Sequence, residues 1–96
     1  MTPKTTLVTL TYGDRLSYLQ TLVGRSLASP QIERVIIVSN ASVAPLESLT
    51  RAWPGQVQII YLQHNTGSAK GYSVGIKAAL DAGADYIWLM DDDNAP

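Results

Sequence analysis

The chain has 96 residues, with 7 Lys and Arg against 8 Asp and Glu, so its formal net charge is −1. Hydrophobic residues make up 46% of the sequence, which excludes intrinsic disorder and is enough for the core of one domain. The absence of cysteine excludes disulfide scaffolds and thiolate metal sites. Without a basic surplus or a run of Lys and Arg, binding to nucleic acid is not expected.

Four apolar segments, at 5–11, 34–39, 57–62 and 85–90, have the composition of buried strands. The segments at 34–39 and 85–90 are nearly continuous in apolar residues rather than alternating. This pattern is typical of parallel strands that are covered on both faces. No apolar run approaches the ~20 residues of a membrane span, and no basic-then-apolar leader opens the chain, so we expect neither a membrane helix nor a signal peptide.

Three stretches between these strands, at 15–28, 45–53 and 68–82, have helical spacing of apolar residues. Asp14 stands where an N-cap would be, and Gly83 where the last helix would stop. The alternation predicts an α/β fold, a Rossmann-like parallel sheet of the type βαβαβαβ with right-handed crossovers. The expected apolar stripes are Leu16, Leu19, Val23 and Leu27, then Leu46, Leu49 and Trp53, then Tyr72, Ile76, Ala79 and Leu80.

The last predicted strand, at 85–90, is followed by a short polar segment that ends at Pro96. Such a strand would lie at or near an edge of the sheet, and an apolar edge invites pairing with another chain. We therefore expect residues 1–96 to be the N-terminal part of a longer protein, and to self-associate when alone. The exposed apolar side chains would be those of Ile87, Trp88, Leu89 and Met90.

Three consecutive aspartates, Asp91, Asp92 and Asp93, directly follow this strand. On an extended backbone Asp91 and Asp93 point to one side and Asp92 to the other. Two carboxylates on one side repel each other unless a cation lies between them, and oxygen ligands without His or Cys favour Mg²⁺ or Mn²⁺. The alternative is a solvated acidic turn or a helix N-terminus. The position at the carboxyl end of a buried parallel strand favours the metal site.

A glycine-rich segment follows the third predicted strand. Gly67, Gly71 and Gly75 recur every fourth residue, and Lys70 adds a cation near a helix N-terminus, which attracts anions. The segment is neither a GxGxxG motif nor a P-loop. Two interpretations stay open at this point: close approach of a ligand, or close packing of the helix on the sheet.

Other candidate residues carry weaker signals. Tyr12 either presents its ring to a base or sugar or covers the edge of the core. Arg15 is interpreted as a solvated residue of a first helical turn, with phosphate binding as the alternative. His64 has no second histidine with which to build a metal site or a catalytic triad, and Trp53 and Trp88 are assigned to packing.

Taken in order, the segments TLVTLTYGDR, RVIIVSNAS, NTGSAKGYSVGI and YIWLMDDDN resemble the start of family 2 glycosyltransferases of the GT-A fold. The members that look most similar are bacterial rhamnosyl- and galactofuranosyltransferases, enzymes of cell-wall or polysaccharide biosynthesis. The resemblance extends from Thr5 to Asn94 and lies in the order and spacing of the four motifs. It implies a partial GT-A domain, for which we expect the strand order 3-2-1-4.

The resemblance also implies roles for single residues. The family's first-strand motif matches Thr11, Tyr12, Gly13 and Arg15, with Asp14 intervening. In the family the Thr and Tyr positions cradle the nucleotide base. After the second strand the family commonly has Asp-Asn, where this chain has Ser39 and Asn40. A serine hydroxyl can accept one hydrogen bond from the base but carries no charge. This chain therefore lacks the carboxylate with which family members select the nucleotide base at this position.

The remaining two motifs match further positions. The family's Asn-x-Gly…Gly segment matches Asn65, Gly67 and Gly71, which places Lys70 near the nucleotide. The DxD-type metal motif gives Asp91 and Asp93 as ligands of Mg²⁺ or Mn²⁺. The residues that the resemblance assigns to the nucleotide sugar are Thr11, Tyr12, Arg15, Ser39, Asn40, Asn65, Gly67, Lys70 and Asp92.

The leading hypothesis is the donor half of a metal-dependent glycosyltransferase that binds a nucleoside-diphosphate sugar, of UDP or dTDP type, for transfer to a hydroxyl of a glycan or lipid-linked acceptor. The family's catalytic base and acceptor half lie beyond the metal motif, so we expect no catalytic residue in this chain and no transfer by it alone. A cytoplasmic location is expected, peripheral to the membrane for the full-length protein. The alternatives are a non-catalytic nucleotide-binding or regulatory module, and a structural or oligomerising piece.

Overall fold

The structure is a computed structural model that describes residues 4–41, 45–64 and 67–92. Within these ranges strands and helices alternate as predicted. No helix of the described part of the chain is long and apolar enough to cross a membrane. The elements are β1 (Thr5–Thr11), α1 (Leu16–Ala28), β2 (Ile32–Asn40), α2 (Glu47–Ala52), β3 (Val57–Leu62), α3 (Ser68–Asp81) and β4 (Tyr86–Leu89).

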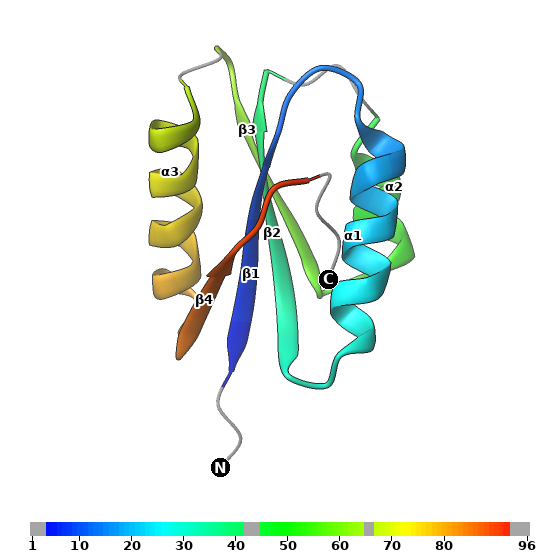
Figure 1. The fold of residues 1–96 in the computed structure, drawn as a ribbon, viewed down its shortest axis with the longest axis vertical. Helices are drawn as coiled ribbons and strands as arrows, with labels where there is room; N and C mark the ends of the chain where they lie inside the picture. Colours follow the sequence, from blue (N-terminus) through cyan, green and yellow to red (C-terminus); the bar gives the residue numbers. More distant parts are fainter. Residues whose placement is uncertain (1–3, 42–44, 65–66, 93–96) are drawn as a thin grey trace.

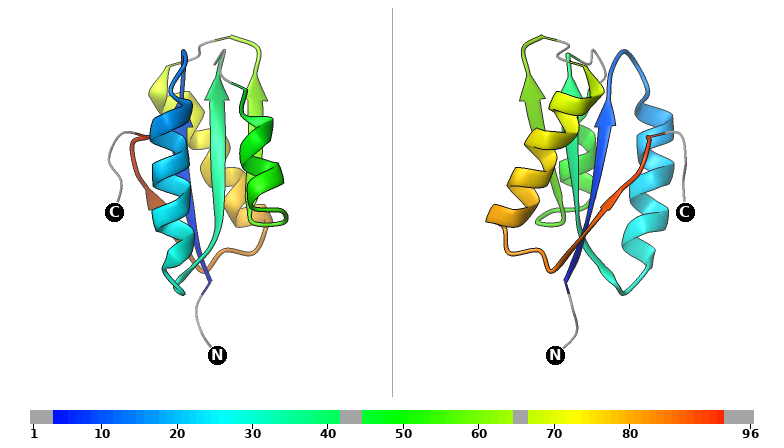
Figure 2. Two further views of the ribbon diagram at one scale, coloured as in Figure 1. Left: turned by 90° about the vertical axis from the view of Figure 1, so that its right-hand side faces the viewer. Right: turned by 60° about the vertical axis from the view of Figure 1, so that its left-hand side comes forward.

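The four strands form one parallel sheet in the order β3-β2-β1-β4, so the expected order 3-2-1-4 is confirmed. Helices α1 and α2 cover one face of the sheet and α3 covers the other (Figures 1 and 2). The chain steps from β1 to β2 in one direction and reaches β4 on the opposite side of β1. The switch point of the strand order therefore lies between the carboxyl ends of β1 and β4, where open α/β sheets bind their ligands.

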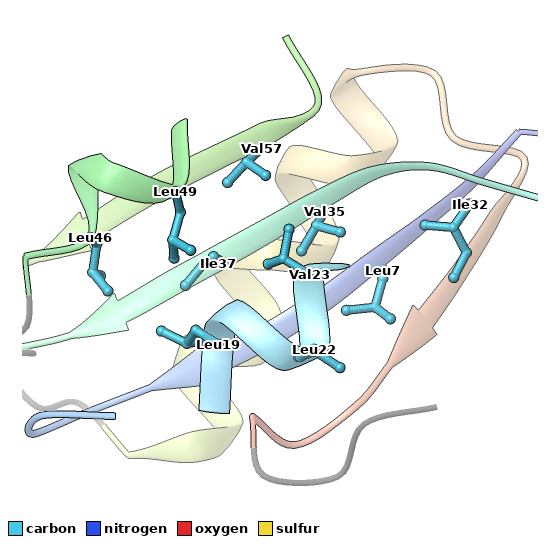
Figure 3. Packing of buried hydrophobic residues seen from close by; sticks show 10 residues of the cluster. All are labelled: Leu7, Leu19, Leu22, Val23, Ile32, Val35, Ile37, Leu46, Leu49 and Val57. Atoms are coloured by element: carbon cyan, nitrogen blue, oxygen red, sulfur yellow. The ribbon is translucent and has the colours of Figure 1, made fainter. Parts of the chain in front are cut away.

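The core consists of two apolar clusters, one on each face of the sheet. Figure 3 shows the larger cluster, between the sheet and helices α1 and α2. Neighbouring residues of β2 belong to different clusters: Ile37 packs in the larger one and Ile36 in the smaller one, against α3. This explains the continuous apolar sequence of β2, because both of its faces are buried.

Strand β4 departs from the prediction that it is buried on both faces. Its side chains Tyr86, Trp88 and Leu89 are 62%, 42% and 46% exposed. The reason is its position at the edge of the sheet, where it pairs with β1 alone within the described residues. The expected exposure is confirmed for Trp88 and Leu89 but is wrong for Ile87 and Met90, which are partly buried against the two clusters. The assignment of Trp88 to packing holds for only part of that side chain.

Two helix ends test the predicted caps. Gly83 is confirmed as the residue that ends α3, and its φ is +86°. The Gly83 N–H donates a hydrogen bond to the Leu80 carbonyl, and the Ala84 N–H donates one to the Ala79 carbonyl. This is the Schellman arrangement, in which glycine avoids the strain of a left-handed backbone. The predicted cap at Asp14 is wrong, because α1 takes Arg15 as its N-cap residue, without a capping bond from that side chain.

Helix α3 lies close to the sheet because small residues face it. A Cβ atom at Gly71 would overlap the side chain of Leu10, and one at Gly75 would overlap Val8 and press against Val38. For these two glycines the structure therefore supports the packing interpretation. The predicted stripe is wrong at Leu80, which is 60% exposed.

At the opposite edge of the sheet, α2 is linked to β3 by a polar contact. The Tyr61 hydroxyl donates a hydrogen bond to Glu47 Oε1 over 3.3 Å. Burial, together with the charge of the Glu47 carboxylate and this bond, raises the pKa of Tyr61. Because this contact belongs to the β3 edge, it takes no part in the site at β1 and β4.

Candidate functional site

The candidate site is built at the carboxyl ends of β1 and β4. The two strands pair in parallel from Thr5 with Tyr86 to Val8 with Leu89, and the Met90 N–H continues the ladder to the Val8 carbonyl at 3.1 Å. This register carries the end of β1 and the residues that follow β4 to the same edge of the sheet. The motif around Thr11 therefore meets the aspartates, although they are far apart in the sequence.

Asp92 is the buried member of the aspartate motif, with only 5% of its surface exposed. The Thr11 hydroxyl donates a hydrogen bond to Asp92 Oδ2 over 3.0 Å, and Arg15 Nε lies 2.9 Å from the same oxygen. A carboxylate removed from water needs partners of this kind to stay charged at tolerable cost. Asp92 thus faces the α1 side of the sheet and is tied to both β1 and the start of α1.

The Arg15 guanidinium group is held on its other side by two tyrosines. Its Nη1 donates a hydrogen bond to the Tyr12 hydroxyl over 2.8 Å. Its central carbon lies 4.9 Å from the ring centroid of Tyr12 and 5.2 Å from that of Tyr18, within the range of cation–π attraction. Both rings remain about half exposed. Tyr18 was not predicted as part of the site, although it lies three residues after Arg15, the N-cap residue of α1, and this spacing brings two side chains to one side of a helix.

Asp91 points the other way and is exposed. The Tyr72 hydroxyl of α3 donates to Asp91 Oδ1 at 3.0 Å and also lies 3.3 Å from the Met90 carbonyl oxygen. Sequence reasoning placed Tyr72 only on an apolar stripe, because helical periodicity describes its ring and not its hydroxyl. An open pocket of about 370 Å³ adjoins this contact and is lined by Tyr72, Trp88, Leu89, Met90 and Asp91.

The residues predicted from the second and third strands form a neighbouring group. Ser39 and Asn40 are buried at the end of β2, and Asn40 Nδ2 donates to the Gly67 carbonyl over 3.4 Å. Gly67 itself has a φ of +85°, which favours glycine, and its carbonyl accepts the Gly71 N–H that opens α3. Lys70 is exposed in the first turn of that helix. Asn40 therefore joins β2 to the turn before α3.

Two of the predicted residues, Asn65 and Asp93, lie outside the described residues. In the described ranges, no three His, Asp or Glu side chains come together in a way that could hold a metal ion. Asp91 offers an exposed carboxylate at the switch point, whereas Asp92 is committed to Thr11 and Arg15. This donor set fits Mg²⁺ or Mn²⁺, because such an ion is commonly held by one or two carboxylates and completed by substrate phosphates.

The strand order and crossovers are those of the GT-A glycosyltransferase fold. The crystal structure of S. aureus TarS 1-349 matches 96% of this chain and 28% of its own with a TM-score of 0.77, at 17% sequence identity. The crystal structure of S. aureus TarS 1-349 in complex with UDP matches equally well, with a TM-score of 0.77. Within that class, the chain belongs to glycosyl transferase family 2, whose family model matches residues 6–96.

Two similar relatives are galactofuranosyltransferases. The chain is 34% identical over 64 residues to galactofuranosyltransferase GlfT1 of Mycolicibacterium smegmatis, covering 67% of this chain and 21% of that protein. It is 33% identical over 63 residues to GlfT1 of Mycobacterium tuberculosis, covering 64% of this chain and again 21% of the relative. The chain thus spans about a fifth of the length of the curated relatives it matches.

Proposed function

We propose that this chain is the donor-binding part of a metal-dependent glycosyltransferase, and that it binds a nucleoside-diphosphate sugar of UDP or dTDP type. The observation that carries the proposal is the aspartate motif after β4, which meets Thr11 and Arg15 at the switch point of the sheet. The UDP complex of S. aureus TarS, a structure of the same fold, supports a nucleoside diphosphate as ligand. The similarity to galactofuranosyltransferases supports the transfer of a sugar. A hydroxyl of a glycan or lipid-linked molecule is the acceptor in this proposal.

The proposed roles follow the two directions of the aspartates. Asp91, together with Asp93, would hold Mg²⁺ or Mn²⁺, which when bound neutralises charge on the departing nucleoside diphosphate. The half-exposed ring of Tyr12 offers an apolar surface for the base, and its hydroxyl is already engaged by Arg15. Ser39, Asn40, Asn65, Gly67 and Lys70 would border the nucleotide from the β2 and α3 side.

Transfer to an acceptor also requires removal of a proton from the acceptor hydroxyl by a positioned carboxylate or imidazole. In the described part of the chain, Asp91 is engaged by Tyr72 and Asp92 by Arg15, and both belong to the proposed donor site. We place the general base in the part of the full-length protein that corresponds to the larger part of the relatives, which this chain does not match. On this proposal the chain alone binds the donor without transferring its sugar.

Calorimetric titration with UDP, dTDP and GDP, with and without Mn²⁺, tests the donor proposal. Metal and diphosphate complete each other's coordination, so we expect Mn²⁺ to tighten binding of the preferred nucleotide by about tenfold or more. Asp91→Asn should remove this gain and leave the metal-free affinity nearly unchanged. Asp81→Asn is the matched control, because Asp81 is an exposed carboxylate at the end of α3. Equal affinity with and without Mn²⁺ in the unmodified chain would contradict the proposal.

A further inference from the structure

Arg15 connects three parts of the candidate site. Its Nε pairs with Asp92 beyond β4, its Nη1 donates to the hydroxyl of Tyr12, and its guanidinium group also faces the ring of Tyr18. The side chain of Arg15 is only 21% exposed. A planar guanidinium group with two of its nitrogens engaged in different directions has little rotational freedom left.

This arrangement fixes the direction of Asp92. The Asp92 carboxylate is almost fully buried, and the same oxygen that pairs with Arg15 also accepts the hydrogen bond of Thr11. Swinging Asp92 towards solvent or towards a ligand would break both contacts and leave the Arg15 guanidinium without its carboxylate. Separating a largely buried ion pair is costly because it leaves a charge without its partner. The ion pair with Arg15 therefore holds the Asp92 side chain strongly in this rotamer.

The direction of Asp92 in turn determines that of Asp91. The two aspartates are adjacent residues just beyond the end of β4, so holding Asp92 inward restricts the peptide that joins them, and Asp91 is exposed and turned towards α3. There the Tyr72 hydroxyl meets Asp91 Oδ1 at 3.0 Å. Contacts on the two faces of the sheet therefore hold the peptide between the two aspartates in one orientation.

We propose that Arg15 is a positioning residue for the aspartate motif and does not bind the diphosphate. By anchoring Asp92 it keeps the Asp91 carboxylate turned to the place where the metal would bind. This inference rests on the proposed function, since it concerns the metal affinity of the same site. It differs from the role that the family resemblance implies, in which Arg15 contacts the nucleotide sugar, and from the interpretation of Arg15 as a solvated residue, because the side chain is largely buried against Asp92.

Two binding measurements on Arg15→Gln separate these roles. The first is Mn²⁺ affinity in the presence of UDP, followed by electron paramagnetic resonance of the free ion. The second is the metal-free affinity for UDP relative to uridine, which lacks phosphates. A positioning role predicts about tenfold weaker Mn²⁺ binding and an unchanged ratio of UDP to uridine affinity. A diphosphate contact predicts instead a fall in that ratio without metal, and this result would overturn the inference.

Arg25→Gln is the matched control, because it removes the same charge from the exposed last turn of the same helix. It should leave Mn²⁺ affinity within twofold of the unmodified chain. Asp92→Asn tests whether Arg15 acts through Asp92, and it should weaken Mn²⁺ binding to a similar extent. The double variant Arg15→Gln/Asp92→Asn should bind Mn²⁺ no more weakly than either single variant. Independent, multiplying losses would overturn the inference.

Folding is checked by circular dichroism at the temperature of the titrations. If Arg15→Gln does not fold, the neutral Arg15→Gln/Asp92→Asn pair and the charge-retaining Arg15→Lys replace it, since neither leaves a buried carboxylate without a partner. Unchanged Mn²⁺ affinity in the Arg15→Gln/Asp92→Asn pair would overturn the role of Arg15 and leave the proposed function standing. Absence of metal-dependent UDP binding in the unmodified chain would instead overturn the proposed function, and the inference with it.

Discussion

Thr9 and Thr11 occupy equivalent positions on β1 but differ in their hydrogen bonding. Both are fully buried on the face of the sheet that carries α1. The Thr11 hydroxyl donates to the Asp92 carboxylate, whereas the Thr9 hydroxyl has no hydrogen-bond partner among the described residues. The two residues therefore separate the effect of a buried hydroxyl from the effect of its bond to the aspartate motif.

We expect Thr11→Val to lower the free energy of unfolding by about 1.5–3 kcal/mol, the range for a hydrogen bond to a charged group. Thr9→Val should be neutral or slightly stabilising, because it replaces an unpaired buried hydroxyl by a methyl group. Urea denaturation of the two variants beside the unmodified chain measures both effects. Equal losses would mean that the bond between Thr11 and Asp92 does not contribute to stability.

The contacts of these residues also show what could be predicted from the sequence. The spacing of apolar residues located the strands and the order of motifs located the aspartates, because both are local properties of the chain. The pairing of Arg15 with Asp92 and that of Tyr72 with Asp91 could not be derived in this way. They depend on the parallel crossover that brings β4 beside β1 and on the direction of each side chain there.

At the scale of elements, the ends and apolar faces of helices were predicted correctly where a single residue type determines the conformation. Gly83 ends α3 because a left-handed residue favours glycine, and the sequence alone carries that signal. The predictions of Asp14 as a helix cap and of Leu80 as a buried residue were wrong for a different reason. A residue caps a helix only if the chain enters the helix in the right direction, and an apolar residue is buried only if the helix turns it towards the sheet. Both conditions are set by tertiary contacts.

Helices α1 and α3 both contain interior glycines, and Gly24 of α1 and Gly75 of α3 have different surroundings. A Cβ atom at Gly75 of α3 would overlap Val8 and press against Val38, whose branched side chains have little freedom to move aside. A Cβ atom at Gly24 of α1 would make an ordinary contact of 3.7 Å with the ring of Trp53. The two glycines thus distinguish helix packing from helix propensity.

We expect Gly75→Ala to destabilise the chain by roughly 1–2 kcal/mol, because overpacking outweighs the gain in helix propensity. Gly24→Ala should stabilise it by roughly 0.5–1 kcal/mol, since only the propensity changes. Thermal denaturation of both variants provides the comparison. A stabilising effect at both positions would show that α3 can move away from the sheet at little cost.

At the scale of the whole molecule, β4 leaves a continuous apolar edge. Tyr86, Trp88 and Leu89 are all exposed there, and the open pocket beside Asp91 lies along the same edge. Full burial of a large apolar side chain contributes roughly 1.5–3 kcal/mol, which is large against a typical total stability of ~5–15 kcal/mol. Covering this edge would therefore yield a substantial gain in free energy.

We therefore propose that the 96-residue chain self-associates through β4 in solution. Trp88→Lys should raise the dissociation constant by at least tenfold, because it replaces a large apolar surface by a charge at the edge of the sheet. Leu80→Lys is the control, since Leu80 is similarly exposed but lies on α3. Light scattering over a concentration series measures the average mass of each variant. A chain that remains monomeric at every concentration, or a loss of association equal in both variants, would show that the β4 edge does not drive assembly.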